Sequence, residues 1–271
     1  MTSPRKLSPQ EEARLAQVRQ QFQQRKAISN QLGRIKNRIG VYSGKGGVGK
    51  TTVAVNLAVM LAQEGANVAI FDCDIDCPNV TRVLRISEGP KQDDEGRFHP
   101  SSRFGVKVMS MSFFQEKEDE AIIWRGPMIH NAINQFLQMT EWGDLDYMIV
   151  DLPPGTSDAP LTVMQTLNLD GFVVVSTPQE LSALDAKRSI NMIKKMNLNV
   201  LGIVENMSGG IFGKGAAEDL ADELELPFLG NVTLRAEFMN SKQPAVLESD
   251  AVADEFSHIA AGVRREITAN A

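Results

Sequence analysis

The stretch Ser43-Gly44-Lys45-Gly46-Gly47-Val48-Gly49-Lys50-Thr51-Thr52 decides the fold of this chain. It matches the phosphate-binding pattern G-x-x-x-x-G-K-[ST]. Residues 39–42, just before it, are rich in β-branched and aromatic side chains, which predicts a strand. After it, Val53, Leu57 and Leu61 recur at helical spacing, so a helix is expected to follow. Strand, glycine-rich loop and helix, in this order, form the context that a phosphate-binding loop requires.

The residue types of this loop suit a bound triphosphate. Backbone N–H groups surround phosphate oxygens only where no side chain intervenes, and the following helix N-terminus adds positive potential. Lys50 is expected to reach the β- and γ-phosphates, and the Thr51 hydroxyl to ligate Mg²⁺. The expected nucleotide-binding residues of the loop are Gly44, Lys45, Gly46, Gly47, Val48, Gly49, Lys50, Thr51 and Thr52.

Composition limits the classes of function. The chain has 271 residues, of which 42% are hydrophobic and 23% charged, as in ordinary globular proteins. The net charge of −6 argues against general attraction to nucleic acid or an anionic membrane, so neither partner is expected. Two cysteines suit a reducing compartment. With no signal-like or membrane-spanning apolar run, the expected location is the cytoplasm.

Apolar strand patterns alternate with helical patterns along the rest of the chain. Because several expected strands are apolar on both faces, they predict a three-layer α/β fold with a mostly parallel sheet, of the P-loop NTPase type. Residues 87–104 are polar and predict an exposed loop or hairpin. The expected strands are 39–42, 67–71, 106–111, 147–150, 172–175, 200–204 and 228–229; the main helices begin at 126, 159, 182, 216 and 251.

Residues 1–38 are predicted to form an N-terminal helical arm, and 39–271 the P-loop domain. Ser8 and Pro9 are typical of a helix start, and the helix is expected to run to about Lys36. Several bases and no acid occur between Arg14 and Arg38. Two interpretations remain open: a solvated face of an arm packed on the domain, or a contact for a partner or an anionic surface.

Hydrolysis of a nucleotide also needs carboxylates near hydrated Mg²⁺. Asp151 ends an apolar strand, where such a carboxylate is expected. Asp72, Asp74 and Asp76 follow the preceding strand, and their mutual repulsion favours a nearby cation. We favour Asp74 as the residue that orients the attacking water, and we leave the role of Asp76 open. The expected metal site is Thr51, with Asp74 and Asp151 acting through water.

Lys45 is an additional base that an ordinary phosphate-binding loop does not require. It is poorly placed to act as Lys50 does on its own nucleotide. One explanation is that Lys45 reaches across a dimer interface and stabilises transition-state charge there, as an arginine finger does. The expected catalytic residues are therefore Lys45, Lys50 and Asp74.

The loop resembles the deviant Walker A motif of the MinD/ParA superfamily. With five further motifs, the chain resembles the Mrp-type (ApbC-like) iron–sulfur cluster carrier ATPases from about Ile39 to Leu247. That resemblance implies an ATP-sandwich homodimer with Mg²⁺, Lys45 acting across the interface, Asp74 as the switch carboxylate, Asn206 reading the adenine, and cluster delivery to apo-metalloprotein clients. The motifs are Trp124-Arg125-Gly126-Pro127-Met128, Asp146 to Thr156, Thr177-Pro178-Gln179, Glu205-Asn206-Met207-Ser208 and Phe228-Leu229-Gly230.

The chain departs from this family in one respect. The family usually carries a C-x-x-C pair shortly after Glu-Asn-Met-Ser, whereas residues 208–215 contain no cysteine. Cys73 and Cys77 are the alternative cluster ligands, but nearby carboxylates disfavour thiolates, and packing is the favoured role of Cys73. The missing pair favours an alternative function, an ATP-driven positioning or assembly switch of the MinD/ParA kind that binds no cluster.

Overall fold

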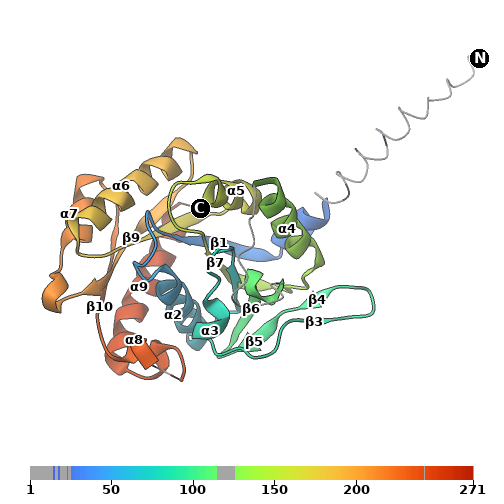
Figure 1. The fold of residues 1–271 in the computed structure, drawn as a ribbon, viewed down its shortest axis with the longest axis horizontal. Coiled ribbons are helices and arrows are strands. Elements are labelled where there is room, and N and C mark those ends of the chain that lie inside the picture. Colours follow the sequence, from blue (N-terminus) through green and yellow to red (C-terminus); the bar gives the residue numbers. More distant parts are fainter. Residues whose placement is uncertain are drawn as a thin grey trace, which may run out of the picture.

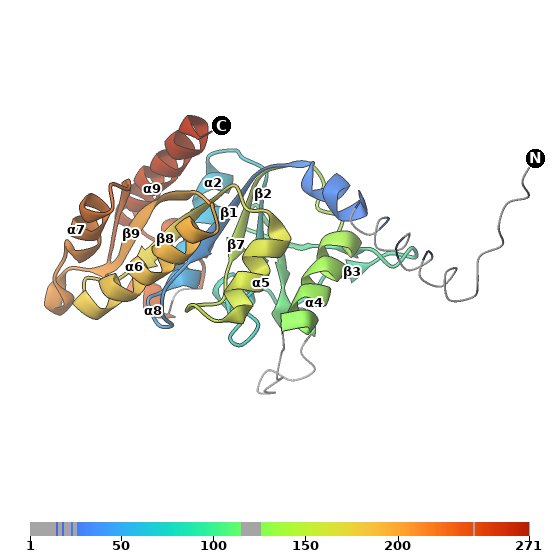
Figure 2. The same ribbon diagram turned by 90° about the horizontal axis from the view of Figure 1, so that it is seen from above.

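The computed structural model describes residues 26–114, 126–240 and 242–270, together with Leu15, Val18 and Gln23. These residues form an eight-stranded sheet in the order β10-β9-β8-β1-β7-β2-β6-β5. All neighbouring strands are parallel except β5, which runs antiparallel to β6 at one edge. Figures 1 and 2 show helices on both faces of this sheet, so the three-layer α/β prediction is confirmed.

Strands β2 and β8 in the interior of the sheet are apolar runs that are buried throughout, as expected for a sheet covered on both faces. A small separate hairpin pairs β3 with β4 within residues 87–104, where an exposed loop or hairpin was predicted. The strands are β1 (Ile35–Tyr42), β2 (Val68–Asp72), β3 (Lys91–Gln92), β4 (Phe98–His99), β5 (Ser101–Arg103), β6 (Val106–Ser110), β7 (Leu145–Asp151), β8 (Gly171–Ser176), β9 (Val200–Ser208) and β10 (Phe228–Thr233).

Two apolar clusters hold the helices on the sheet. One cluster joins α4, α5, α6 and α7 to one face, and the other joins α2, α3 and α9 to the opposite face. The helices are α2 (Lys50–Gln63), α3 (Val80–Val83), α4 (Gly126–Met139), α5 (Asp158–Leu167), α6 (Glu180–Lys195), α7 (Ala216–Glu223), α8 (Glu237–Asn240) and α9 (Asp250–Ala269), with 3-10 turns η1 (Met111–Phe114), η2 (Gly210–Phe212) and η3 (Ala245–Leu247).

The helix before β1 is shorter than predicted. Within the described residues it ends at Leu32, and β1 begins at Ile35. The expectation that the helix continues to about Lys36 is therefore wrong. The main-chain N–H of Gly33 closes the last turn on the Ser29 carbonyl, and Ile35 pairs with Leu145 in the sheet. The apolar residues before β1 also fit the spacing of a helix, which led to the longer prediction. In the structure, pairing with β7 outweighs this local propensity.

The order of strands places the chemistry-bearing residues together. β7 lies between β1 and β2, and Asp151 on β7 is the register partner of both Val41 and Asp72. The phosphate-binding loop follows β1, so the loop and the carboxylates meet at the carboxyl edge of one sheet, where ligands bind in such folds. Among the described residues, no helix is both long and apolar enough to cross a membrane.

Candidate nucleotide-hydrolysis site

The glycine-rich loop adopts a conformation that its glycines permit. Gly47 and Gly49 have φ angles of 83° and 81°, in the left-handed region that side chains rarely adopt. A Cβ on Gly49 would lie 2.1 Å from the Asn206 Nδ2 atom. Gly49 is also the N-cap of α2, and no side chain caps this helix. The first-turn N–H groups of α2 are therefore available to an anion.

Lys50 lies beneath this loop between two carboxylates. Its Nζ atom is 2.6 Å from Asp151 Oδ1 and 3.4 Å from Asp74 Oδ2, and the residue is only 6% exposed. Burial opposes its charge, but Asp151 and Asp74 outweigh this, so the pKa of Lys50 is raised. Lys50 is therefore held as a cation, and it is the only base paired with Asp151 or Asp74 within the described part of the chain.

Thr51 and Asp151 fit the expected position of a divalent cation. The Thr51 hydroxyl donates a hydrogen bond of 2.6 Å to Asp151 Oδ2. Hard oxygen donors and an excess of carboxylate over ammonium are what Mg²⁺ requires. Yet no group of three or more His, Cys, Asp or Glu side chains within the described ranges is arranged to hold a metal directly. The residues therefore fit Mg²⁺ that is completed by phosphate oxygens and water, not a cation caged by protein alone.

Asp72 anchors the segment that carries Asp74, a role that the sequence did not reveal. Its Oδ1 atom accepts the Asp74 N–H at 3.2 Å. Its Oδ2 atom accepts the Val80 N–H at 3.2 Å and the Ser110 hydroxyl at 2.9 Å. The carboxylate thus holds both ends of residues 74–80. Burial, followed by the nearby Asp151, raises the pKa of Asp72 well above its usual range.

A second tether joins the loop to the segment after β7. The Tyr42 hydroxyl donates to the Gly155 carbonyl, and the Gly155 N–H donates to the Ser43 carbonyl at 2.9 Å. The Ser43 hydroxyl in turn donates to the Lys45 carbonyl at 2.9 Å. Tyr42, Ser43 and Ser110 were not predicted as site residues. Tyr42 and Ser43 adjoin the loop in sequence, but their partners are not evident from it, and only the pairing of β6 with β2 brings Ser110 to this edge.

Three polar candidates from the sequence lie outside the cluster around Lys50. Lys45 is half-buried, and within the described residues no side chain pairs with its ammonium group. Asp76 is exposed, and the ion pairs of Lys50 within the described residues are with Asp74 and Asp151 instead. The role of Asp76 stays open. Asn206 is 5% exposed and donates to the Val48 carbonyl at 2.8 Å, so it lies against the phosphate-binding loop.

Comparisons with known proteins agree with this geometry. Residues 34–264 match the sequence model of a ParA-type family described as NUBPL iron-transfer P-loop NTPase. This chain belongs to that family. The expected kinship with iron–sulfur cluster carrier ATPases of the MinD/ParA superfamily is thereby confirmed.

Individual proteins show how similar this chain is to known sequences and structures. An iron–sulfur cluster carrier protein of Methanocaldococcus jannaschii is 40% identical over 252 residues, which cover 88% of this chain and 87% of the relative. The solved structure of a nucleotide-binding protein from Archaeoglobus fulgidus, in complex with ADP, has a TM-score of 0.68 and 35% identity, covering 88% and 91% of the two chains. The MinD cell division ATPase of Pyrococcus furiosus, at 23% identity and a TM-score of 0.66 over 85% and 99% of the chains, shares the fold.

In this chain, the segment after Asn206 is closed by a carboxylate and carries no thiol. Glu205 is 1% exposed and accepts the Ser208 hydroxyl at 2.8 Å and the N–H groups of Gly215 and Ala217 at 3.0 Å. These bonds close residues 208–215 into a compact turn in front of α7. Ile211, at the tip of this turn, is 95% exposed.

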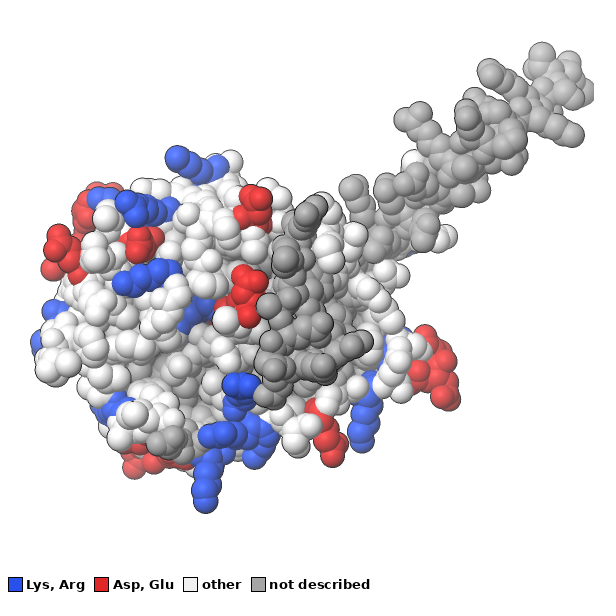
Figure 3. Space-filling view, in the orientation of Figure 1, with Lys and Arg blue, Asp and Glu red and all other residues white. Residues whose placement is uncertain are grey.

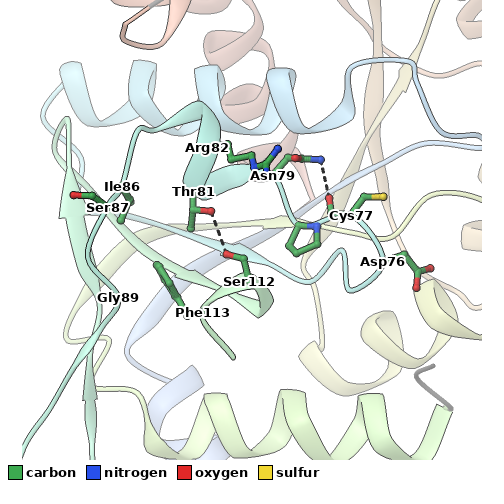
Figure 4. Close-up of a pocket in the computed structure, with 11 residues that line it drawn as sticks. Asp76, Cys77, Asn79, Thr81, Arg82, Ile86, Ser87, Gly89, Ser112 and Phe113 are labelled. Carbon is green, nitrogen blue, oxygen red and sulfur yellow. Dashed lines mark hydrogen bonds between the residues drawn. The ribbon is translucent and has the colours of Figure 1, made fainter. Parts of the chain in front are cut away.

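The two cysteines lie in different surroundings. Cys73 is fully buried within the apolar cluster beside α4 and α5. Burial and then the adjacent Asp72 raise the pKa of its thiol well above the ordinary value, which suits packing. Cys77 is exposed and lines, with Asp76 and Arg82, a surface pocket of about 330 Å³ (Figure 4). Trp124 and Arg125 lie outside the described residues.

Proposed function

We propose that this chain is a Mg²⁺-dependent ATPase that forms an ATP-sandwich homodimer and acts in iron–sulfur cluster carrying or metalloprotein maturation. The observation that carries the ATPase proposal is the position of Lys50 between Asp151 and Asp74, beneath a helix N-terminus that no side chain caps. The iron-transfer family supports the role in cluster carrying.

The two contacts of Lys50 suggest how nucleotide binding acts on the switch segment. The contact with Asp151 is short, whereas the contact with Asp74 is 3.4 Å. A γ-phosphate beside Lys50 competes for the ammonium group, and the longer contact is the easier one to lose. Asp74 is then free to orient the attacking water. Mg²⁺, held by Thr51 and through water by Asp151, would neutralise phosphate charge.

Replacement of Lys45 by alanine tests the dimeric part of this proposal. We expect turnover to fall about a hundredfold, because a cation that contacts only transition-state charge is lost. The affinity for ATP is expected to change little, since Lys50 and the loop backbone remain. Turnover is measured under saturating Mg²⁺-ATP, and sedimentation with ATP or ADP reports the dimer. A Lys45→Ala protein with full dimerisation and full turnover would refute the role of Lys45.

The donors for a cluster are fewer than the family resemblance implies, because this chain has only Cys73 and Cys77. Iron–sulfur clusters are commonly held by four thiolates, and a homodimer of this chain exposes one cysteine, Cys77, from each copy. We therefore propose that any cluster is shared, with Cys77 of both copies supplying part of the ligand set and a client protein supplying the rest. The buried Cys73 contributes no ligand in this arrangement.

Anaerobic reconstitution with iron and sulfide tests this ligand assignment. With an apo-client that carries cysteines, we expect cluster absorbance on the mixture that is lost with Cys77→Ser and retained with Cys73→Ser. Iron and acid-labile sulfide are quantified in each preparation. Absence of a cluster from every preparation, with ATPase activity intact, would favour the alternative function of an ATP-driven positioning or assembly switch, which the missing C-x-x-C pair supports.

A further inference from the structure

A groove with an apolar floor lies between α6 and α7. Its volume is about 430 Å³. Leu181 and Leu184, one helical turn apart on α6, are 71% and 45% exposed there. Large aliphatic side chains exposed side by side are uncommon on a monomer unless another element covers them. The groove is lined by Pro178, Glu180, Leu181, Ala183, Leu184, Lys187, Ala216, Asp219, Leu220 and Glu223.

The border of this groove is mainly acidic. Helix α7 has the sequence AAEDLADE, with four carboxylates and no base. The groove itself is lined by Glu180, Asp219 and Glu223, and its one lysine, Lys187, is paired with Glu223. Figure 3 shows carboxylates at the left of the molecule, over α7, with cations close beside them. An occupant of the groove should therefore be an amphipathic segment with basic flanks.

The N-terminal arm of this chain has that chemistry. Leu15 and Val18 are helical and are 41% and 56% exposed, so neither is covered by its own domain. Val18 follows Leu15 by three residues, and in the sequence Phe22 follows Val18 by four, so the three positions have helical spacing. No acid occurs between Arg14 and Arg38, whereas several bases flank this apolar stripe. We propose that the groove between α6 and α7 receives the N-terminal arm of a second copy of this chain.

The position of the arm favours a second copy over its own chain. Residues 26–32, from which the arm departs, lie beside α4, at the opposite end of the molecule from α7 in both Figure 1 and Figure 2. To reach its own groove, the arm would have to turn back across α4, α5 and α6. In a symmetric pair each chain places its arm in the groove of the other. The apolar side chains of each arm then pack between α6 and α7 of its partner, as in helix-in-groove recognition.

Disulfide cross-linking between two chains tests the contact. Both full-length chains carry Cys77→Ser, which leaves only the buried Cys73; one carries Val18→Cys and the other, differently tagged, carries Leu184→Cys. They are mixed with a mild oxidant, which accepts the two electrons of disulfide formation, and without nucleotide, so the result does not depend on the proposed ATP dimer. We expect the mixed disulfide to form about tenfold faster than in a control pair of Val18→Cys with Met239→Cys. Met239, on α8, is 78% exposed and lies outside the groove.

A second measurement does not rely on engineered thiols. In sedimentation without nucleotide, Leu184→Lys and Val18→Lys are each expected to weaken self-association about tenfold, and the double variant hardly further, because both remove one contact. Met239→Lys should leave it unchanged, and added salt should weaken the native association.

Three results would overturn the proposal. The first is equal cross-linking in the control pair. The second is self-association that Leu184→Lys and Met239→Lys change equally. The third concerns a single chain that carries both Val18→Cys and Leu184→Cys. If its disulfide forms at a rate independent of protein concentration, the arm lies on its own domain.

Discussion

Replacing Lys50 by methionine is expected to lower ATP hydrolysis by at least about a thousandfold, because the cation that contacts the transferred phosphate is lost. Methionine keeps an unbranched apolar side chain of similar length, so the change is mainly one of charge. The variant should also bind ATP more weakly. Turnover and nucleotide affinity are compared with those of Lys195→Met, a control at an exposed lysine of α6.

The same variant is expected to be less stable without nucleotide. Lys50 is the cation between Asp151, Asp74 and Asp72, and removal of one partner from a buried ionic cluster costs about 3–5 kcal/mol. The free energy of unfolding is measured by denaturant titration. Unchanged stability of Lys50→Met at neutral pH would show that the carboxylates are not held by this lysine.

The loss of unfolding free energy in Lys50→Met should depend on pH in a defined direction. The folded-state pKa of Lys50 is raised, so its stabilisation is fully present below the unfolded pKa and is lost only as pH rises through the raised value. The pKa values of Asp72 and Asp74 are also raised, so the folded state favours their protonated forms. Their ionisation therefore costs stability as pH rises. The deficit of Lys50→Met should shrink as pH falls and these carboxylates take up protons.

Changing Asp74 to asparagine is expected to lower turnover about a thousandfold while ATP binding changes little. The substitution preserves shape and removes the charge that orients the attacking water. The Cys77 N–H, which Asp74 Oδ1 accepts at 3.3 Å, still finds an acceptor in the amide oxygen. A selective loss of turnover, with ATP affinity intact, would separate this role from general binding.

Asp76→Asn is the matched control, since Asp76 is two residues away and exposed. Its turnover should stay near that of the native chain. Burial raises the pKa of Asp74 despite the opposing effect of Lys50, so native turnover should fall toward acidic pH as Asp74 is protonated. Equal losses in Asp74→Asn and Asp76→Asn would contradict the assignment of the switch carboxylate.

The sequence predicted the elements that carry the site, because each has a strong local signal. The loop 43–52 is a contiguous pattern, and Asp72 and Asp151 each end a continuous apolar strand. Parallel pairing then brings these strand ends together, so the neighbourhood of the carboxylates followed from fold class alone.

The supporting contacts could not be predicted in this way. Ser110 reaches Asp72 from β6, and Tyr42 reaches Gly155 from β1, and both contacts depend on strand order and register. The predicted end of the N-terminal helix was wrong because Ile35 fits a helical apolar stripe as well as it fits β1. Asp72, expected only as one of several carboxylates, is the anchor of residues 74–80 because three donors converge on it.

In the proposed dimer each hydrolytic site is composed of two chains, and mixing two inactive variants tests this composition. Lys45→Ala keeps Lys50 and Asp74 but has no lysine to offer its partner, whereas Asp74→Asn keeps Lys45 but has no functional site of its own. If Lys45 acts across the interface, equal mixing of the two inactive variants should restore about a quarter of native turnover, because half of the dimers are mixed and each has one complete site. A mixture as inactive as its components would show that Lys45 acts within its own chain and that the hydrolytic site is not shared between two chains.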